Sequence, residues 1–471
     1  RNERFGFFHS ASVAWRIDQE SFMRNVDAIS NLKLRASYGS LGNQDVSNYG
    51  YIPFMGTTQS SYLIGDGRPL VMNPPGLVSS NYTWEKVNTT NFGVDLGLYK
   101  NRLSVAFDIY SRNTLNMLTL GKQLPGVLGA SEPSENAADL KTTGWELSLA
   151  YQNKFQVANS PLSFNARFVV SDSRSEITRF DNPNNSILQY YKGMKLGEIW
   201  GLESDGLFKD QSEIDKLDQT SIIPWGALQI VPGWPKYIDQ DKNGAIEKGY
   251  TIGDTKDLKI IGNTTPRYQF GLDLNSNWKN FDVRLFMQGV AKRDYYPLDY
   301  LYFGFYQQPY GNTYEHLLDF YRPADDNAVD LSKRSQAYIK AGLANANPDA
   351  KFPILQSWLA DANLGTRIDN AMGMVIPQTG HLKNAAYLRI KNITIGYTLP
   401  KTLTDKFGID RVRVYIAGEN VFEWSAIKNY FDPESTNANI ITNPSTGTGR
   451  TGHGMTYPFQ RSYSAGLNVI F

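Results

Sequence analysis

The segment 237–247, YIDQDKNGAIE, has the residue spacing of a calcium-binding loop, because it contains the pattern D-x-D-x-N-G. Oxygen-bearing side chains at ligand spacing are Asp239, Asp241, Asn243 and Glu247. Gly244 would provide the sharp turn that such a loop needs, and the carbonyl of Ala245 a further oxygen. The pattern therefore predicts a structural Ca²⁺ site, and no other cofactor is expected.

The match to a calcium loop is incomplete. The twelfth position of the loop, where a bidentate Glu normally binds the ion, is Tyr250. Asp254 could supply the missing carboxylate from further along the chain. The alternative interpretation is a turn rich in Asp and Asn within an external loop, which these residue types also favour.

Residues typical of catalysis are sparse. The four histidines, His9, His316, His381 and His453, have no partners at metal-ligand spacing, and no G-x-S-x-G motif occurs. Residues 447–452 match G-x-G-x-x-G, but they lie in a Ser/Thr/Gly-rich stretch without the strand and helix of a dinucleotide site. We therefore expect no enzymatic activity.

Aromatic side chains in the predicted loops are candidate substrate-binding residues, because their faces stack on sugar rings or peptide side chains. The candidates are Trp225, Trp234, Tyr300 and Tyr306. Aromatic residues also form interfacial girdles in membrane barrels, and long loops need apolar cores of their own. Both alternatives stay open for these four residues.

Composition narrows the class of protein. The 47 Lys and Arg nearly balance the 46 Asp and Glu among 471 residues, so nothing indicates a nucleic-acid partner. Cysteine is absent, which excludes disulfides, thiolate metal sites and a cysteine nucleophile. With a mean hydropathy of −0.41, no run is long enough for a transmembrane helix, although barrel strands hide their apolar face in a period of two.

The last nine residues, 463–471, show this period clearly. Tyr463, Ala465 and Leu467 begin one apolar face, which continues through Val469 and Phe471, with small or polar residues mostly between them. Such a strand suits a wall with lipid on one side and a polar lumen on the other. The chain is accordingly predicted to be all-β and to form a transmembrane antiparallel β-barrel.

About eleven segments show the strand period. The predicted strands are 10–16, 31–38, 90–99, 103–110, 144–151, 163–171, 267–277, 281–290, 386–397, 411–422 and 462–471. Long connections, such as 172–266 and 291–385, alternate with short ones near 100–102, 152–162 and 279–280. Outer-membrane barrels combine short periplasmic turns with long extracellular loops, so the alternation favours that class.

An odd number of strands cannot close a bacterial single-chain barrel, and an open edge in lipid leaves backbone groups unpaired. We therefore expect residues 1–471 to be the C-terminal part of one larger barrel domain. The strand that pairs with 463–471 would then precede Arg1.

Several motifs together resemble a known family. Residues 384–400 (NAAYLRIKNITIGYTLP) and 411–422 (RVRVYIAGENVF), followed by FDPE at 431–434, closely resemble the C-terminal region of SusC/RagA-type TonB-dependent outer-membrane transporters. Residues 31–43 and 84–93 resemble the same family, as does TGWEL at 143–147.

The resemblance implies a barrel of about 22 strands, of which this chain would be the C-terminal half, without the plug and TonB box. It implies import of oligosaccharides or peptides across the outer membrane of a Gram-negative bacterium. The family also implies that this bacterium belongs to the Bacteroidota. The implied partners are a SusD-like surface lipoprotein, the TonB complex, the N-terminal half of the barrel and outer-membrane lipid. A passive porin-like or adhesive barrel is the alternative, and a soluble glycan-binding β-protein is a third.

Overall fold

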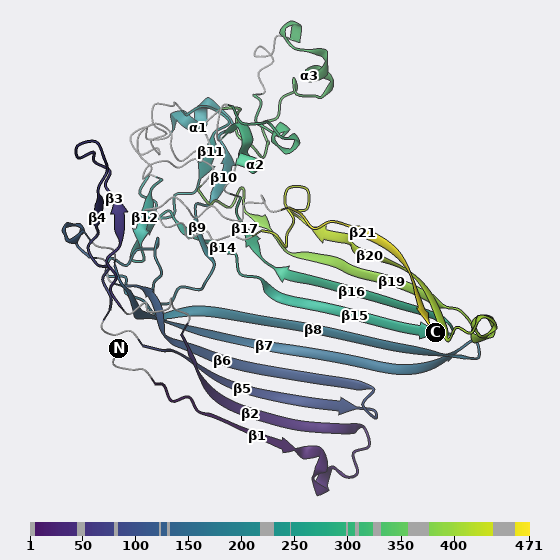
Figure 1. Ribbon diagram of the computed structural model, residues 1–471. Helices are drawn as coiled ribbons and strands as arrows, with labels where there is room; N and C mark the ends of the chain where they lie inside the picture. Colours follow the sequence, from purple (N-terminus) through teal and green to yellow (C-terminus); the bar gives the residue numbers. More distant parts are fainter. Residues whose placement is uncertain are drawn as a thin grey trace.

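A curved sheet of 11 antiparallel strands dominates the structure, a computed structural model (Figure 1). The residues described are 5–44, 52–79, 83–121, 124–129, 132–216, 230–244, 246–297, 300–306, 310–323, 331–356, 376–436 and 457–471. The sheet runs from β1 at one edge to β21 at the other, and each strand pairs with the spanning strands before and after it in the chain.

The sheet strands are β1 (Ser10–Arg16), β2 (Ile29–Asn43), β5 (Glu85–Leu98), β6 (Leu103–Leu120), β7 (Ser134–Val157), β8 (Ser160–Arg179), β15 (Arg267–Trp278), β16 (Phe281–Lys292), β19 (Tyr387–Thr398), β20 (Arg411–Ser425) and β21 (Ser462–Ile470). All eleven predicted strands are confirmed. Several are much longer than predicted, because the alternation of apolar and polar residues is interrupted in their outer ends, such as 111–120 and 134–143. Hydrophobic alternation marks only the part of a strand that has one apolar side.

The short connections lie at one end of the sheet. The link predicted at 152–162 is wrong, because β7 and β8 continue through it and leave only Ala158 and Asn159 as the turn. Both residues have positive φ, 46° and 58°, as a type I′ hairpin turn requires. The β15–β16 turn also has two residues, and Lys279 has a φ of 53°.

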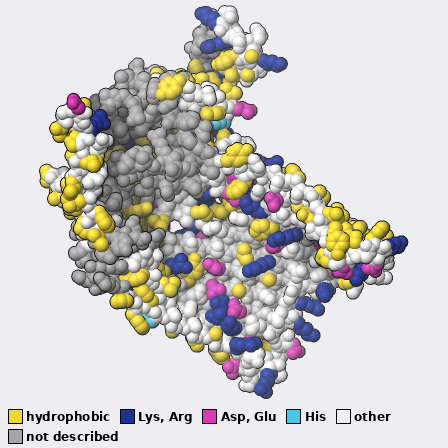
Figure 2. Space-filling view, in the orientation of Figure 1, with side chains coloured by type: hydrophobic (Ala, Val, Ile, Leu, Met, Phe, Trp, Pro, Cys, Tyr) yellow, Lys and Arg dark blue, Asp and Glu magenta, His cyan; other side chains and the backbone are white. Residues whose placement is uncertain are grey.

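The two faces of the sheet differ in polarity. One cross-strand row joins Leu34, Val94, Phe107 and Leu147 on four successive strands. Residues next to this row in sequence, such as Arg35 and Asp108, point to the opposite face, where charged side chains are spread over the sheet (Figure 2). This division agrees with the predicted lipid side and polar lumen.

Ion pairs on the polar face cross a glycine on the strand between the two partners. The Arg35 guanidinium donates to both carboxylate oxygens of Asp108, two strands away, with distances of 2.9 Å. A Cβ on Gly93, which lies between them, would come within 2.6 Å of both side chains. Gly396 allows the same approach between Asp282 and Arg413. Because these glycines have no side chain, charged residues on the two flanking strands can form ion pairs directly over the strand between them.

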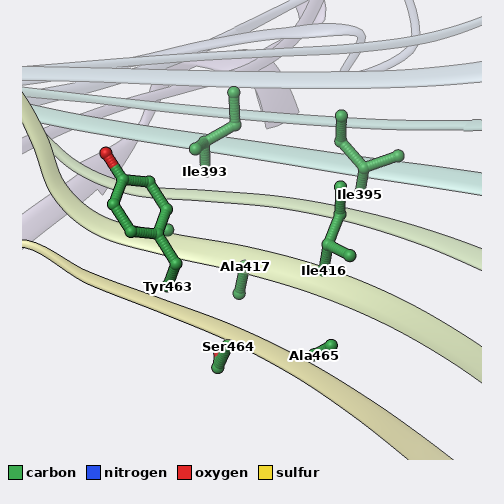
Figure 3. A pocket seen from close by; sticks show the side chains of 8 residues that line it. Ile393, Ile395, Ile416, Ala417, Tyr463, Ser464 and Ala465 are labelled. Carbon is green, nitrogen blue, oxygen red and sulfur yellow. The ribbon is translucent and has the colours of Figure 1, made fainter.

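The apolar face is hollowed near the last strand. Side chains of β19, β20 and β21, among them Ile393, Ile395, Ile416 and Tyr463, surround a cavity of about 470 Å³ (Figure 3). Gly418 and Ala465 leave the space beside the Tyr463 ring.

The long connections carry shorter elements, gathered at the end of the sheet opposite the tight turns (Figure 1). They include β3 (Thr57–Gln59), β4 (Leu70–Met72), β9 (Glu198–Gly201), β10 (Ser204–Leu207), α1 (Gln211–Asp215), β11 (Pro235–Tyr237), β12 (Lys248–Thr251), β13 (Asp254–Lys256), β14 (Lys259–Asn263), β17 (Asp294–Tyr295), α2 (Tyr300–Phe303), α3 (Gln336–Lys340) and β18 (Lys383–Asn384). A fourth helix, α4 (Lys401–Thr404), lies in a short connection. Within the described parts of the chain, no helix has the length and apolar character needed to cross a membrane.

A cluster of charges around Arg389 attaches one loop to the sheet. The Arg389 side chain, only 2% exposed, forms ion pairs with Glu423 of β20 and with Asp432 and Glu434 of the following loop. Asp432 also accepts a hydrogen bond from the backbone N–H of Phe459, at 3.0 Å. One arginine thus holds both the loop after β20 and the segment that leads into β21.

Replacing Arg389 with Met should destabilise this end of the sheet by about 3 kcal/mol, because three carboxylates lose the cation that compensates their burial. The matched control is Arg284→Met, since the Arg284 side chain is 53% exposed in its pair with Asp273. We expect the control to cost less than about 1 kcal/mol. Urea unfolding in detergent measures both, and equal losses in the two variants would contradict the role given to Arg389.

Candidate functional site

The long loops share one aromatic core. Buried residues from loops far apart in the sequence pack together, among them Trp234, Tyr295, Tyr302, Phe303, Tyr306, Leu317, Phe352 and Phe431. The loop that follows β17 also contains the 3-10 turn Glu315–Leu318 and the helix α3. Burial of this much aromatic surface makes the loops a packed unit on the sheet.

Two of the predicted substrate-binding residues lie within that core. Trp234 and Tyr306 are fully buried; the Trp234 Nε1–H donates to Gln356 Oε1, and the Tyr306 hydroxyl donates to the carbonyl of Pro353. In this arrangement both rings support the loop fold. Tyr300 lies in α2, and Trp225 lies outside the described residues. Substrate contact by the four stays a prediction.

Two histidines belong to the same core, where they are surrounded by rings. His381 is 5% exposed and contacts the rings of Phe303 and Phe352. Burial lowers the pKa of His381 to about 3, and the nearby ammonium of Lys383 adds to the effect. Burial also lowers the pKa of His316, whose ring stacks on Tyr302. Both imidazoles are therefore neutral at pH 7.

The predicted calcium loop folds around its own acidic side chains. The Asp239 carboxylate accepts hydrogen bonds from the backbone N–H groups of Lys242 and Gly244, at 2.6 and 2.8 Å. Gly244 has a φ of 84°, which gives the expected sharp turn. The Asn243 side-chain amide donates to both Asp241 and Glu247. The four predicted ligands thus lie in one turn, where the Glu247 carboxylate is also 3.5 Å from the Lys256 ammonium.

A third aspartate, which the sequence did not indicate, completes the group. Oxygens of Asp239, Asp241 and Asp257 lie within 4.8 Å of one another. Asp257 is buried and accepts hydrogen bonds from the backbone N–H groups of Gln240 and Glu247. Asp254, considered from the sequence, instead lies 3.9 Å from Lys256. The missed carboxylate comes from the residue after β13, which the β12–β13 hairpin folds back onto the loop.

The electrostatics of this group suit a cation. Burial raises the pKa of Asp257, and the negative charges of Asp239 and Asp241 act in the same direction, against the two backbone hydrogen bonds. A hard cation such as Ca²⁺ takes carboxylate and carbonyl oxygens and would remove the repulsion among the three acids. Calcium binding here stays a prediction.

Comparisons with known proteins identify relatives that align with the whole length of this chain. No protein-family model matches. The chain is 25% identical over 488 residues to TonB-dependent receptor P3 of Formosa agariphila, covering 42% of that protein. It is 24% identical over 480 residues to TonB-dependent receptor SusC of Bacteroides thetaiotaomicron, covering 40% of it. The chain is homologous to TonB-dependent receptors.

Solved structures show the same fold as this chain. The RagAB peptide transporter superposes with a TM-score of 0.68 at 22% identity, over 100% of this chain and 44% of that one. The open-open state of the RagAB peptide importer gives a TM-score of 0.69. These findings confirm the resemblance to SusC- and RagA-type transporters and the β-barrel fold class. The relatives are receptors and transporters, in agreement with the expectation of no enzymatic activity.

Calcium is expected to stabilise the loop assembly of this TonB-dependent receptor homologue. At a concentration 100 times the Kd, binding to the folded state alone adds about 2.7 kcal/mol. Asp241→Asn should remove most of the effect, because it deletes a charged ligand. Asp349→Asn is the control, since Asp349 is an exposed loop acid paired with Lys209. Thermal unfolding in Ca²⁺ and in a chelator tests this; a wild-type protein that does not respond would refute the site.

The loop core should also weaken in acid because of His381. An unfolded histidine binds a proton near pH 6.5, whereas folded His381 does so near pH 3. Between these values the unfolded form holds more protons, so stability falls as pH falls, by about 1.4 kcal/mol per unit.

Hydrogen exchange of the amides of 376–384 at pH 7 and pH 5 measures this dependence. His381→Phe keeps the ring contacts and removes the titration, leaving only the smaller contribution of His316, which has the same sign. An equal pH dependence in wild type and His381→Phe would contradict the assignment to His381.

Proposed function

We propose that this chain forms wall and extracellular loops of an energy-coupled importer in the outer membrane of a Gram-negative bacterium of the Bacteroidota. The observation that carries the proposal is the alignment of the whole chain with receptors named TonB-dependent, including SusC. The fold shared with RagAB and the separation of tight turns from long loops support it. The chain supplies no covalent chemistry in this function.

The rest of the transporter is proposed to lie outside these residues. The chain spans about two fifths of the length of the curated relatives that it matches. Residues 1–471 would then be the C-terminal part of one barrel domain, completed by an N-terminal half, a plug and a TonB box. The plug would be pulled by the TonB complex, and a SusD-like lipoprotein would cover the extracellular loops.

The cargo is proposed to be an oligosaccharide or a peptide. One solved relative is described as a peptide transporter, and another relative carries the name SusC. The loop unit lies at the end of the sheet opposite the tight turns, where cargo would enter (Figure 1), and its aromatic rings suit either class. Trp225, Trp234, Tyr300 and Tyr306 stay candidates for that contact.

Uptake in cells tests the proposal against the passive alternative. A strain that depends on this protein should lose uptake of labelled oligosaccharide or peptide when TonB is deleted or the proton-motive force is collapsed. A passive barrel would keep the uptake in both cases. Affinity purification from outer membranes should also recover a surface lipoprotein, and its absence would remove the lipoprotein from the proposal.

A further inference from the structure

A polar cavity of about 370 Å³ lies between the ends of β8 and β16 and the loop strands β9 and β14. Asp108, Glu146 and Ser171 are cross-strand partners on successive strands, so Ser171 belongs to the polar face of the sheet. Ser173 and Ser175, which line the cavity, follow at intervals of two residues and point to the same face. The cavity therefore lies on the polar face, at the end of the sheet that carries the long loops (Figure 1).

Lys292 of β16 reaches the cavity from the same face. Gln269 of β15 pairs with Ser171 on one side and with Val290 on the other. Lys292 lies two residues beyond Val290, so its side chain also points to the polar side. Under the proposed function this face lines the lumen, and cargo that enters from the loops passes the cavity.

Hydrogen bonds of the backbone hold the walls of the cavity in place. The Leu196 N–H donates to the carbonyl of Ser175 at 2.9 Å, which joins the loop after β8 to the end of that strand. The Thr264 N–H donates to the carbonyl of Gly197 at 2.8 Å, which joins the same loop to the segment after β14. The chain thus forms the cavity by itself, and a ligand would not have to order these walls.

The two acidic side chains of the lining already have donors from the chain. Glu198 is 8% exposed and accepts hydrogen bonds from the Tyr191 hydroxyl at 2.6 Å and from the Lys195 backbone N–H at 3.0 Å. Asp294 accepts from the backbone N–H of Asn263 at 2.9 Å. Both carboxylates therefore stabilise the walls of the cavity.

Two basic side chains of the lining have no such partners. Lys195 and Lys292 are exposed, and among the described residues neither ammonium has a hydrogen bond or a carboxylate within ion-pair distance. The other two bases differ, because Arg267 is paired with Asp172 and Arg174 alternates to the opposite face of β8. An ammonium offers three donors, so Lys195 and Lys292 are available to an acceptor that enters the cavity.

A partly buried arginine adds positive charge behind the wall. The Arg293 guanidinium donates to the backbone carbonyls of Thr264, at 3.1 Å, and of Pro433 and Thr436. In the part of the chain that the structure describes, it forms no ion pair with a carboxylate. Its charge therefore acts on the cavity together with the charges of the two lysines.

We infer that this cavity binds a carboxylate of the cargo. Lys195 and Lys292 are the charged donors, and the Ser173 hydroxyl, which has no partner among the described residues, is a neutral donor. Hydrogen bonds between an ammonium and a carboxylate are among the stronger ones in proteins. The inference rests on the proposed function and narrows its cargo to acidic molecules, either oligosaccharides with uronic acids or peptides rich in Asp and Glu.

Isothermal titration calorimetry of the whole protein, purified from outer membranes in detergent, tests the inference. The probes are tetragalacturonate and its neutral, carboxyl-reduced form, tetraglutamate and tetraglutamine, and tetralysine. One of the two acidic probes should bind at least about tenfold more tightly than its neutral partner, and the pair that shows this difference identifies the class of cargo. Absence of the difference in both pairs would overturn the inference, and so would tighter binding of tetralysine than of either acid.

Variants locate the site. Lys195→Gln combined with Lys292→Gln should weaken binding of the acidic probe by about tenfold or more and leave the neutral probe unchanged. The matched control, Lys154→Gln combined with Lys406→Gln, removes two exposed lysines that do not line the cavity and should bind like the wild type. Unchanged binding of the acidic probe in the first variant, or an equal loss in the control, would refute the site.

Uptake in cells separates this inference from the proposed function. Uptake that requires TonB but shows no preference for acidic cargo would refute only the carboxylate site. Uptake that continues without TonB would instead refute the proposed function.

Discussion

The rest of this structure depends on one requirement. Every backbone N–H and C=O group in the sheet must have a hydrogen-bond partner. Lipid offers no partner for these groups, so each spanning segment must lie in a ladder with its neighbours. Successive side chains of a paired strand point to opposite sides of the sheet, so one face can be apolar and the other polar. On the polar face, Gly93 and Gly396 let charges on strands two apart pair directly. The same sheet thus satisfies its backbone and neutralises much of its inner charge.

Long loops create a second requirement, because a loop without a core has little to hold it in place. Here the loops satisfy it with buried aromatic rings and with ion pairs at their base. Arg389 joins β19, the loop after β20 and the segment before β21 through three carboxylates. The loop unit is therefore attached to the sheet through several segments that are distant from one another in the sequence.

The sequence predicted the number and order of the spanning strands, because alternation reports directly on the apolar face. It did not predict their outer extensions, as in 134–143, where apolar and polar residues do not alternate regularly. Spacing indicated the four residues of the acidic loop that are predicted to be oxygen ligands, but it did not indicate Asp257. The β12–β13 hairpin brings Asp257 back to the loop, and this long-range contact cannot be predicted from the spacing of residues within the loop. Burial of Trp234 and Tyr306 likewise depends on contacts between distant loops.

The contrast between two-residue turns and long loops has a consequence for the order of folding. Closing a loop costs more conformational entropy as it lengthens, by about 0.6 kcal/mol for each doubling. The β7–β8 hairpin, with only Ala158 and Asn159 between its strands, closes at little cost. Pairing β8 with β15 must close the whole of 180–266, at about 3 kcal/mol more. Hairpins joined by tight turns should therefore form first, and the ladders beneath the long loops should join these hairpins into the wall.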